Sequence, residues 1–175
     1  HSVGVYLLLR QFNAPREEQV AGLLHDIAHT AFSHVIDYVF DDSESQTVHE
    51  KFHNQVIFAS QIPSILQKYS LDINYVTDEH NFPLLERNLP DICADRLDYF
   101  LRDSYLIGVS TKNDISQIIS ALTTHNNEFI FNNQDTAYLA SQKFIETCIQ
   151  FWGPPIKSGS YTLTGNIVIL AIDKK

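Results

Sequence analysis

Apolar residues recur at helical spacing along most of the chain. Residues 3–12 predict an apolar helix that ends before Pro15. A second helix is predicted from about Pro15 to Ala31, because apolar residues follow one another there at intervals of three and four positions. These residues are Val20, Leu23, Leu24, Ile27, Ala28 and Ala31. Both segments therefore indicate helices that each bury one face.

Further along the chain, the same spacing predicts a series of helices. They cover residues 32–40, 47–60, 64–69, 91–107, 114–122 and 135–152. The alternating pattern of 126–133 is compatible with a small β-hairpin. The tail 161–172 is ambiguous, because its β-branched residues favour a strand whereas the helical context favours another helix. Since strands and helices do not alternate, we expect an all-α helical bundle in which residues 1–175 form one domain.

Composition and charge narrow the classes of partner. No apolar run approaches the ~20 residues that a membrane-spanning helix needs, and no charged-then-apolar leader opens the chain, so we expect a cytoplasmic protein. The formal net charge of -9 argues against nucleic acid as a partner, although a bound cation could still attract a small anionic substrate. Cys93 and Cys148 form no CxxC pair and are expected to be free thiols. Because the sequence lacks methionine and opens on His1, we expect an N-terminally truncated chain.

Histidines are concentrated in one part of the chain. Five of the eight fall within positions 25–53, and His25 and Asp26 are adjacent in the predicted second helix. Burying an imidazole and a carboxylate costs free energy unless both find a partner. A divalent cation would pair with both side chains, but a His–Asp hydrogen bond that fixes packing would do so more simply. The dipeptide alone favours the hydrogen bond.

The helix predicted over 91–107 carries a polar stripe. Four of its residues recur at positions i, i+4, i+7 and i+8, which places them on one face. They are Asp95, Tyr99, Arg102 and Asp103. Such a stripe is compatible with a solvated face that holds weak Asp–Arg pairs. An aromatic ring among charged groups also suits a cleft for a sugar and phosphates, and the spacing does not separate the two interpretations.

Together, the histidines and aspartates resemble the signature of a known family. His1, the adjacent His25 and Asp26, and finally Asp95 resemble the H…HD…D pattern of the HD-domain metal-dependent phosphohydrolases. Members of this family are helical and hold one divalent ion through two histidines and two aspartates. The resemblance therefore implies one bound divalent metal ion, and Fe, Mn, Zn, Ni and Mg all suit such ligands.

Two longer segments point to one branch of that family. HDIAHTAFSHVID at 25–37 and DRLDYFLRDSYLIG at 95–108 resemble segments of the deoxynucleoside triphosphate triphosphohydrolases. The resemblance extends over residues 1–110. It departs from the family after the HD pair, because the glycines and proline that usually shape the following turn are replaced. The replacing residues are Ala28, Thr30 and Ala31.

The resemblance also implies roles for residues around the ligands. His34 would act in proton transfer, and Asp37 would orient it; a plain surface hydrogen bond between the two is the alternative. The residues implied in substrate binding are His29, His49, Arg96, Tyr99, Arg102 and Asp103. Tyr99 and Asp103 would contact a deoxyribose, and His49 and Arg96 would contact phosphate. His29 would face phosphate or support the metal ligands, and Arg102 would contact phosphate or pair with a carboxylate of its own helix.

The function implied most concretely is metal-dependent hydrolysis of a (deoxy)nucleoside triphosphate to nucleoside and triphosphate. A nucleoside monophosphate phosphatase or a cyclic-nucleotide phosphodiesterase is an alternative within the same family. A different alternative is a non-catalytic domain that senses a nucleotide or binds a partner protein. The resemblance also implies assembly into a homo-oligomer.

Overall fold

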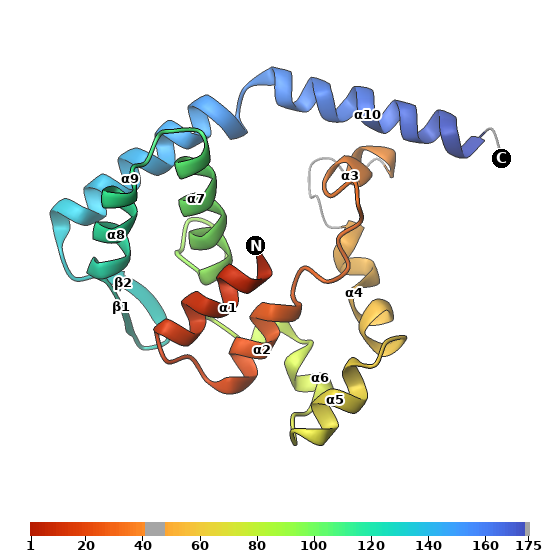
Figure 1. The fold of residues 1–175 in the computed structure, drawn as a ribbon, viewed down its shortest axis with the longest axis horizontal. Helices are drawn as coiled ribbons and strands as arrows, with labels where there is room; N and C mark the ends of the chain where they lie inside the picture. The colour runs from red at the N-terminus through yellow and green to blue at the C-terminus, as the bar shows by residue number, and fades with distance from the viewer. Residues whose placement is uncertain (41–47, 174–175) are drawn as a thin grey trace.

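The computed structural model describes residues 1–40 and 48–173, and of 48–50 it describes the backbone alone. Most of this part of the chain is helical (Figure 1), which confirms the all-α class. The helices are α1 (Ser2–Gln11), α2 (Arg16–Leu24), α3 (Val35–Val39), α4 (Val48–Phe58), α5 (Ile62–Lys68), α6 (Ile73–Val76), α7 (Ala94–Leu106), α8 (Lys112–Ala121), α9 (Gln134–Thr147) and α10 (Pro155–Asp173). A 3-10 turn, η1 (Glu79–Asn81), precedes α7, and a π-helical turn, η2 (Cys148–Trp152), follows α9.

A small antiparallel hairpin joins α8 to α9. Strand β1 (Leu122–His125) pairs with β2 (Glu128–Phe131), so that Leu122 lies opposite Phe131. Asn126 and Asn127 form the connecting turn with φ angles of 51° and 59°, as the two-residue turns of hairpins require. The hairpin begins at Leu122, before the segment 126–133 from which it was predicted.

The second helix is shorter than its apolar spacing predicts. α2 ends at Leu24, whose carbonyl accepts a hydrogen bond from the His53 ring at 3.1 Å. Beyond it the backbone forms tighter turns, in which the amide of His29 donates to the carbonyl of Asp26 at 3.0 Å. The prediction of a helix as far as Ala31 was therefore wrong, because a tertiary contact ends the helix where the apolar spacing continues.

Other helix bounds differ less from the expected ones. α7 begins at Ala94 rather than Asp91, because Cys93 before it has extended backbone. The helix ends just before Gly108, whose φ of 77° suits a residue without a side chain. The ambiguous tail 161–172 is helical and lies within α10.

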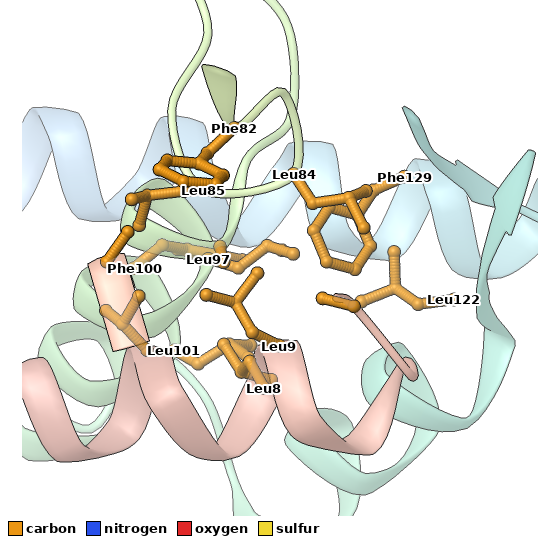
Figure 2. Close-up of a cluster of buried hydrophobic side chains, with 14 of the residues drawn as sticks. Leu8, Leu9, Phe82, Leu84, Leu85, Leu97, Phe100, Leu101, Leu122 and Phe129 are labelled. Carbon is orange, nitrogen blue, oxygen red and sulfur yellow. The ribbon is translucent and has the colours of Figure 1, made fainter. Parts of the chain in front are cut away.

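Helix α1 lies at the centre of the described residues and packs against both α2 and α7. Helices α1 and α2 approach each other closely at Gly22, where an added Cβ would lie 2.5 Å from the Leu9 side chain. The buried core spreads from this crossing to the loop before α7 and to the hairpin (Figure 2). Its members include Leu8, Leu9, Phe82, Leu84, Leu85, Leu97, Phe100, Leu101, Leu122 and Phe129.

A buried carboxyl group ties α2 to the loop that leads into α7. Glu18 is 3% exposed and accepts hydrogen bonds from the amides of Leu84 (2.7 Å) and Leu85 (3.0 Å). Burial raises the pKa of Glu18, although the two amides oppose that shift. The contact fixes where the start of α7, which carries Asp95, lies relative to α2, whose C-terminal end precedes His25 and Asp26.

The last helix returns along the molecule to α3. α10 leaves η2 and packs against α3, where the rings of Tyr161 and Tyr38 are 5.8 Å apart and Gly165 approaches Tyr38. Much of its remaining surface is apolar and exposed, as at Ile156 and Leu163. Within the described residues, no helix combines the length and the apolar character that are needed to cross a membrane.

Candidate metal centre

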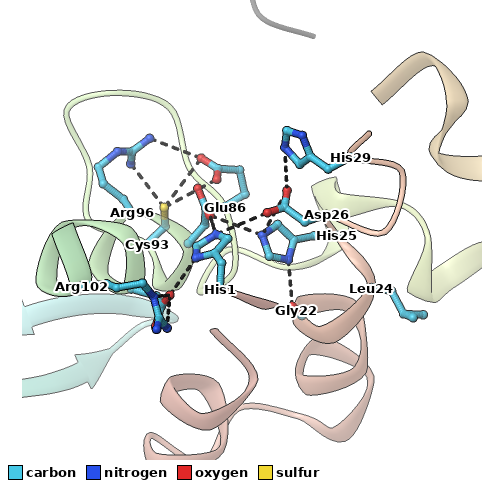
Figure 3. A network of polar contacts seen from close by, with 12 residues as sticks. His1, Gly22, Leu24, His25, Asp26, His29, Glu86, Cys93, Arg96 and Arg102 are labelled. Atoms are coloured by element: carbon cyan, nitrogen blue, oxygen red, sulfur yellow. Dashed lines mark hydrogen bonds and ion pairs between the residues drawn. The ribbon is translucent and has the colours of Figure 1, made fainter. Parts of the chain in front are cut away.

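Three separate segments bring the four predicted metal ligands together (Figure 3). His1 precedes α1, His25 and Asp26 follow α2, and Asp95 lies in the first turn of α7. Nε2 of His1 lies 2.6 Å from Oδ1 of Asp95 and 3.6 Å from Oδ2 of Asp26. Nε2 of His25 lies 3.3 Å from Oδ1 of Asp95 and 3.6 Å from Oδ1 of Asp26. These four residues, the His–Asp cluster, could share one cation.

The orientation of His25 is suited to metal binding. Its Nδ1 lies 2.8 Å from the carbonyl oxygen of Gly22, so Nδ1 carries the proton and donates. Nε2 is buried and makes no hydrogen bond of normal geometry, although Asp95 is nearby. Leaving such a nitrogen buried without a well-formed hydrogen bond costs free energy. A cation bound by Nε2 would remove that cost, and the residues present therefore fit a metal ion.

His1 is held from behind by a second carboxylate. Its Nδ1 lies 2.7 Å from Oδ2 of Asp98, which is buried. Arg102 donates to both carboxylate oxygens of Asp98 at 2.9 Å, so Arg102 pairs within its own helix. α1 can approach so closely because Gly4 has no side chain, and a Cβ there would overlap the Asp98 carboxylate. Such carboxylate–histidine pairs commonly orient metal-binding imidazoles.

The electrostatics of the His–Asp cluster favour positive charge. Burial lowers the pKa of His1, but hydrogen bonds to Asp95 and Asp98 outweigh burial and raise it to about 10. Burial raises the pKa of Asp95, but the hydrogen bond with His1 and the nearby charge of His25 hold it below its usual range. The carboxylates therefore attract positive charge, whether protons or a cation carry it.

Comparison with known proteins identifies the fold around these residues. A sequence model of the HD domain matches residues 1–103, which is more than half of the chain and includes the whole His–Asp cluster. The chain belongs to the HD-domain family. This confirms the resemblance inferred from the sequence.

Two proteins that are similar to this chain match nearly all of it. The uncharacterized protein YdhJ of Bacillus subtilis is 37% identical over 162 residues, or 92% of this chain, and the metal-dependent phosphohydrolase cns2 of Cordyceps militaris is 34% identical over 174 residues, or 96%. The chain spans only 50% of the length of each. The deoxynucleoside triphosphate triphosphohydrolase SAMHD1 homolog of Dictyostelium discoideum is 25% identical over 119 residues, 58% of this chain and 22% of its own length.

Within this HD domain, the predicted proton-transfer pair lies beside the cluster. Nε2 of His29 is 3.4 Å from Oδ1 of Asp26, and the His29 and His34 rings are 4.9 Å apart. Nδ1 of His34 is 3.2 Å from Oδ2 of Asp37, which is 1% exposed. Ser33 makes the turn into His34 with a positive φ of 46°. The structure thus brings the pair together, and its role stays a prediction.

Arg96 points into the protein. Its guanidinium donates to the carbonyl of Asp91, the thiol of Cys93 (3.3 Å) and the carboxylate of Glu86 (3.4 Å). Glu86, Cys93 and Asp95 offer donor atoms within 4.8 Å of one another, but burial raises the pKa of Cys93 to about 12, so this thiol keeps its proton. Glu86 and Cys93 therefore suit an internal ion pair with Arg96 better than a second metal ion. A contact between Arg96 and phosphate stays a prediction.

The polar stripe of α7 leads away from the cluster to the end of α9. The Tyr99 ring lies 6.5 Å from the His1 ring and 5.2 Å from the Trp152 ring. One turn further along α7, Oδ2 of Asp103 accepts a hydrogen bond from Nε1 of Trp152 at 2.8 Å. Both residues predicted to contact a sugar are therefore in contact with Trp152.

The remaining histidines separate into different environments. The side chain of His49 lies outside the described residues, and so does its predicted contact with substrate. His53 is buried, whereas the side chain of His80 is 98% exposed. A cavity of about 230 Å³ opens beside His25 and is lined by His53 and residues 77–80. A larger groove of about 500 Å³ between α1, α7 and α8 has a mainly apolar lining, which suits charged phosphates poorly.

Sequence reasoning missed three residues of the site. Asp98 behind His1 carried a usable signal, since it follows Asp95 by three positions and so lies on a neighbouring face of the same helix. Glu86 precedes α7 in a loop whose course the sequence does not specify. Trp152 is distant in the chain from Asp103, and local periodicity gives no indication of that contact.

Proposed function

We propose that this HD domain hydrolyses a nucleotide phosphoester, with one divalent metal ion held by the His–Asp cluster. The observation that carries the proposal is the buried Nε2 of His25, which makes no hydrogen bond of normal geometry and lies 3.3 Å from Asp95 and 3.6 Å from Asp26. When bound, the ion would supply Lewis-acid chemistry toward a phosphate oxygen and a water molecule. Two imidazoles and two carboxylates suit Fe, Mn, Zn, Ni or Mg.

His34 and Asp37 would move the proton that the hydrolysis requires. Asp37 is almost fully buried and contacts Nδ1 of His34, which favours the tautomer with the proton on Nδ1. Nε2 would then be the atom that exchanges a proton with water or the leaving oxygen. His29 lies between this pair and Asp26, so it would help to place a phosphate between the two groups.

The substrate we propose is a (deoxy)nucleoside triphosphate, cleaved to nucleoside and triphosphate. One named relative supports this choice of substrate, the deoxynucleoside triphosphate triphosphohydrolase homolog of Dictyostelium discoideum. The metal-dependent phosphohydrolase of Cordyceps militaris supports metal-dependent hydrolysis without naming a substrate. Tyr99 and Asp103 would contact the sugar, because they follow Asp95 along one face of α7. We further propose that residues 1–175 act as one domain, and we expect assembly into a homo-oligomer.

A nucleotide panel tests the proposed function. The protein is incubated with each metal and with deoxynucleoside triphosphates, monophosphates and cyclic nucleotides, while release of triphosphate, orthophosphate and nucleoside is measured separately. We expect equal amounts of nucleoside and triphosphate. Orthophosphate from monophosphates would instead indicate a phosphatase, opening of cyclic nucleotides a phosphodiesterase, and binding without turnover a sensing domain.

Variants separate the chemistry from the fold. Asp26→Asn should abolish turnover, and His34→Gln should lower kcat by roughly 10²–10⁴-fold, the usual contribution of a general acid or base. His80→Gln is the matched control, because this imidazole is exposed and makes its ion pair with Asp78 alone among the described residues. Equal activity of all three variants would contradict the proposed function.

A further inference from the structure

The π-helical turn at the end of α9 determines where Trp152 points. In η2 the amide of Gly153 donates to the carbonyl of Cys148, five residues earlier, at 2.7 Å. A single π turn inserts one residue into a helix and so rotates the side chains that follow, and such turns are frequent at functional sites. Here it directs Trp152 toward α7 rather than along the face of α9. Trp152 is half-buried there, with Phe144 on one side at 5.3 Å between ring centroids.

Trp152 contacts two consecutive turns of the polar stripe. Its ring meets Tyr99 edge to face at 5.2 Å, and its Nε1 donates to Oδ2 of Asp103 at 2.8 Å. The indole N–H of tryptophan can only donate a hydrogen bond. It therefore holds one oxygen of the Asp103 carboxylate in place. Among the described residues, no hydrogen bond reaches Oδ1 of Asp103, so that oxygen remains to accept one from a ligand.

The arrangement joins a fixed carboxylate to an aromatic wall, at a short distance from the His–Asp cluster. Tyr99 lies between the two, since its ring is 6.5 Å from His1 on one side and meets Trp152 on the other. A carboxylate oxygen beside aromatic rings suits a group that carries hydroxyls on an otherwise apolar frame, such as a sugar ring.

We propose that Trp152 is a positioning residue for the sugar of the substrate: it fixes Asp103 so that Oδ1 accepts a hydrogen bond from a sugar hydroxyl. This proposal rests on the proposed function, because it takes the substrate to be a nucleotide. It extends the site beyond residues 1–103, which the HD-domain model matches. The C-terminal part of the chain thereby contributes to selection of the substrate, while the His–Asp cluster contributes the chemistry.

The test uses the fact that Trp152 is the single tryptophan in the sequence. Trp152 emission is followed while 2′-deoxynucleoside triphosphate, or its 2′,3′-dideoxy analogue, is added to the metal-loaded protein, and binding is measured in parallel by calorimetry. We expect saturable change in emission with the deoxynucleotide at the concentrations where calorimetry shows binding. Unchanged emission during binding would overturn the proposal.

Kinetics of two variants complete the test. Trp152→Phe keeps an aromatic ring but removes the N–H, and it should reduce the preference in kcat/KM for the deoxy over the dideoxy substrate by about tenfold, the loss expected for one hydrogen bond. Phe151→Leu, in the same π turn but beneath Lys157 rather than against α7, should keep the preference. A preference unchanged in Trp152→Phe would overturn this proposal alone. Absence of nucleotide binding and turnover in the unmodified protein would instead refute the proposed function, and this proposal with it.

Discussion

His1 and Asp98 form a hydrogen bond of 2.7 Å between Nδ1 and Oδ2, on the side of the imidazole opposite the His–Asp cluster. The bond fixes the ring so that Nε2 faces Asp95. Partners of this kind behind a metal-binding histidine typically contribute 10–100-fold to metal affinity, as an order of magnitude. Asp98 is thus a positioning residue for the proposed metal centre.

Asp98→Asn should therefore weaken metal binding by roughly 10–100-fold. Asparagine keeps the size of the side chain but removes the charge that holds the imidazole. Affinity is measured by competition with a chelating dye. Asp91→Asn is the matched control, because Asp91 is exposed and pairs with Arg87 outside the cluster. Equal affinities of the two variants would show that Asp98 does not support the centre.

Gly4→Ala should destabilise the protein by about 1–3 kcal/mol, the usual cost of overpacking. The added Cβ would overlap the Asp98 carboxylate and push α1 away from α7. Unfolding in urea measures the change. Gly159→Ala, in α10, serves as the control: nothing lies within 4 Å of its added Cβ, so it should stabilise the helix slightly. A neutral Gly4→Ala would mean that the two helices are not so closely packed.

Glu18→Ala should lower the free energy of unfolding by about 1–3 kcal/mol, because it leaves the buried amides of Leu84 and Leu85 without an acceptor. Glu17→Ala removes a neighbouring carboxylate that makes no such contact, and it should change stability by less than about 0.5 kcal/mol. Both are measured by urea unfolding at neutral pH. Similar values for the two variants would contradict the role of Glu18 as an anchor of the loop before α7.

The same residue predicts a pH dependence. Burial raises the pKa of Glu18 in the folded protein above its value in the unfolded chain, so the folded state binds this proton more tightly. The bound proton therefore contributes to the free energy of unfolding. This contribution is fully present below the pKa of Glu18 in the unfolded chain and is lost as pH rises through its pKa in the folded protein. Glu18→Gln cannot ionise, so its stability relative to the unmodified protein should increase over that pH interval. Parallel stability curves for the two proteins would contradict a raised pKa.

The sequence predicted the elements that depend on local periodicity. α1, α8 and most of α7 follow from apolar spacing, and Gly108 marks the end of α7 through its positive φ. The end of α2 did not follow, because a contact with His53, which is distant in the chain, decides it. Tertiary hydrogen bonds of this kind override local spacing.

Some residues of the candidate site were likewise predictable from the sequence and others were not. The pattern of His1, His25, Asp26 and Asp95 was recognisable as a family signature, and the structure brings these residues together. The inward orientation of Arg96 was not recognisable, since its partners lie in a loop of irregular course. Neither was the contact between Trp152 and Asp103, which depends on a π turn in a segment that reads as ordinary helix.

The most direct measurement is elemental analysis of the purified protein, combined with thermal unfolding with and without added metals. We predict about one divalent ion per chain, lost in Asp26→Asn, and a melting temperature that rises when the ion is restored to the unmodified protein, because binding to the folded state stabilises it. His80→Gln should retain the ion. A protein that contains no metal and whose melting temperature no divalent ion changes would contradict the metal centre.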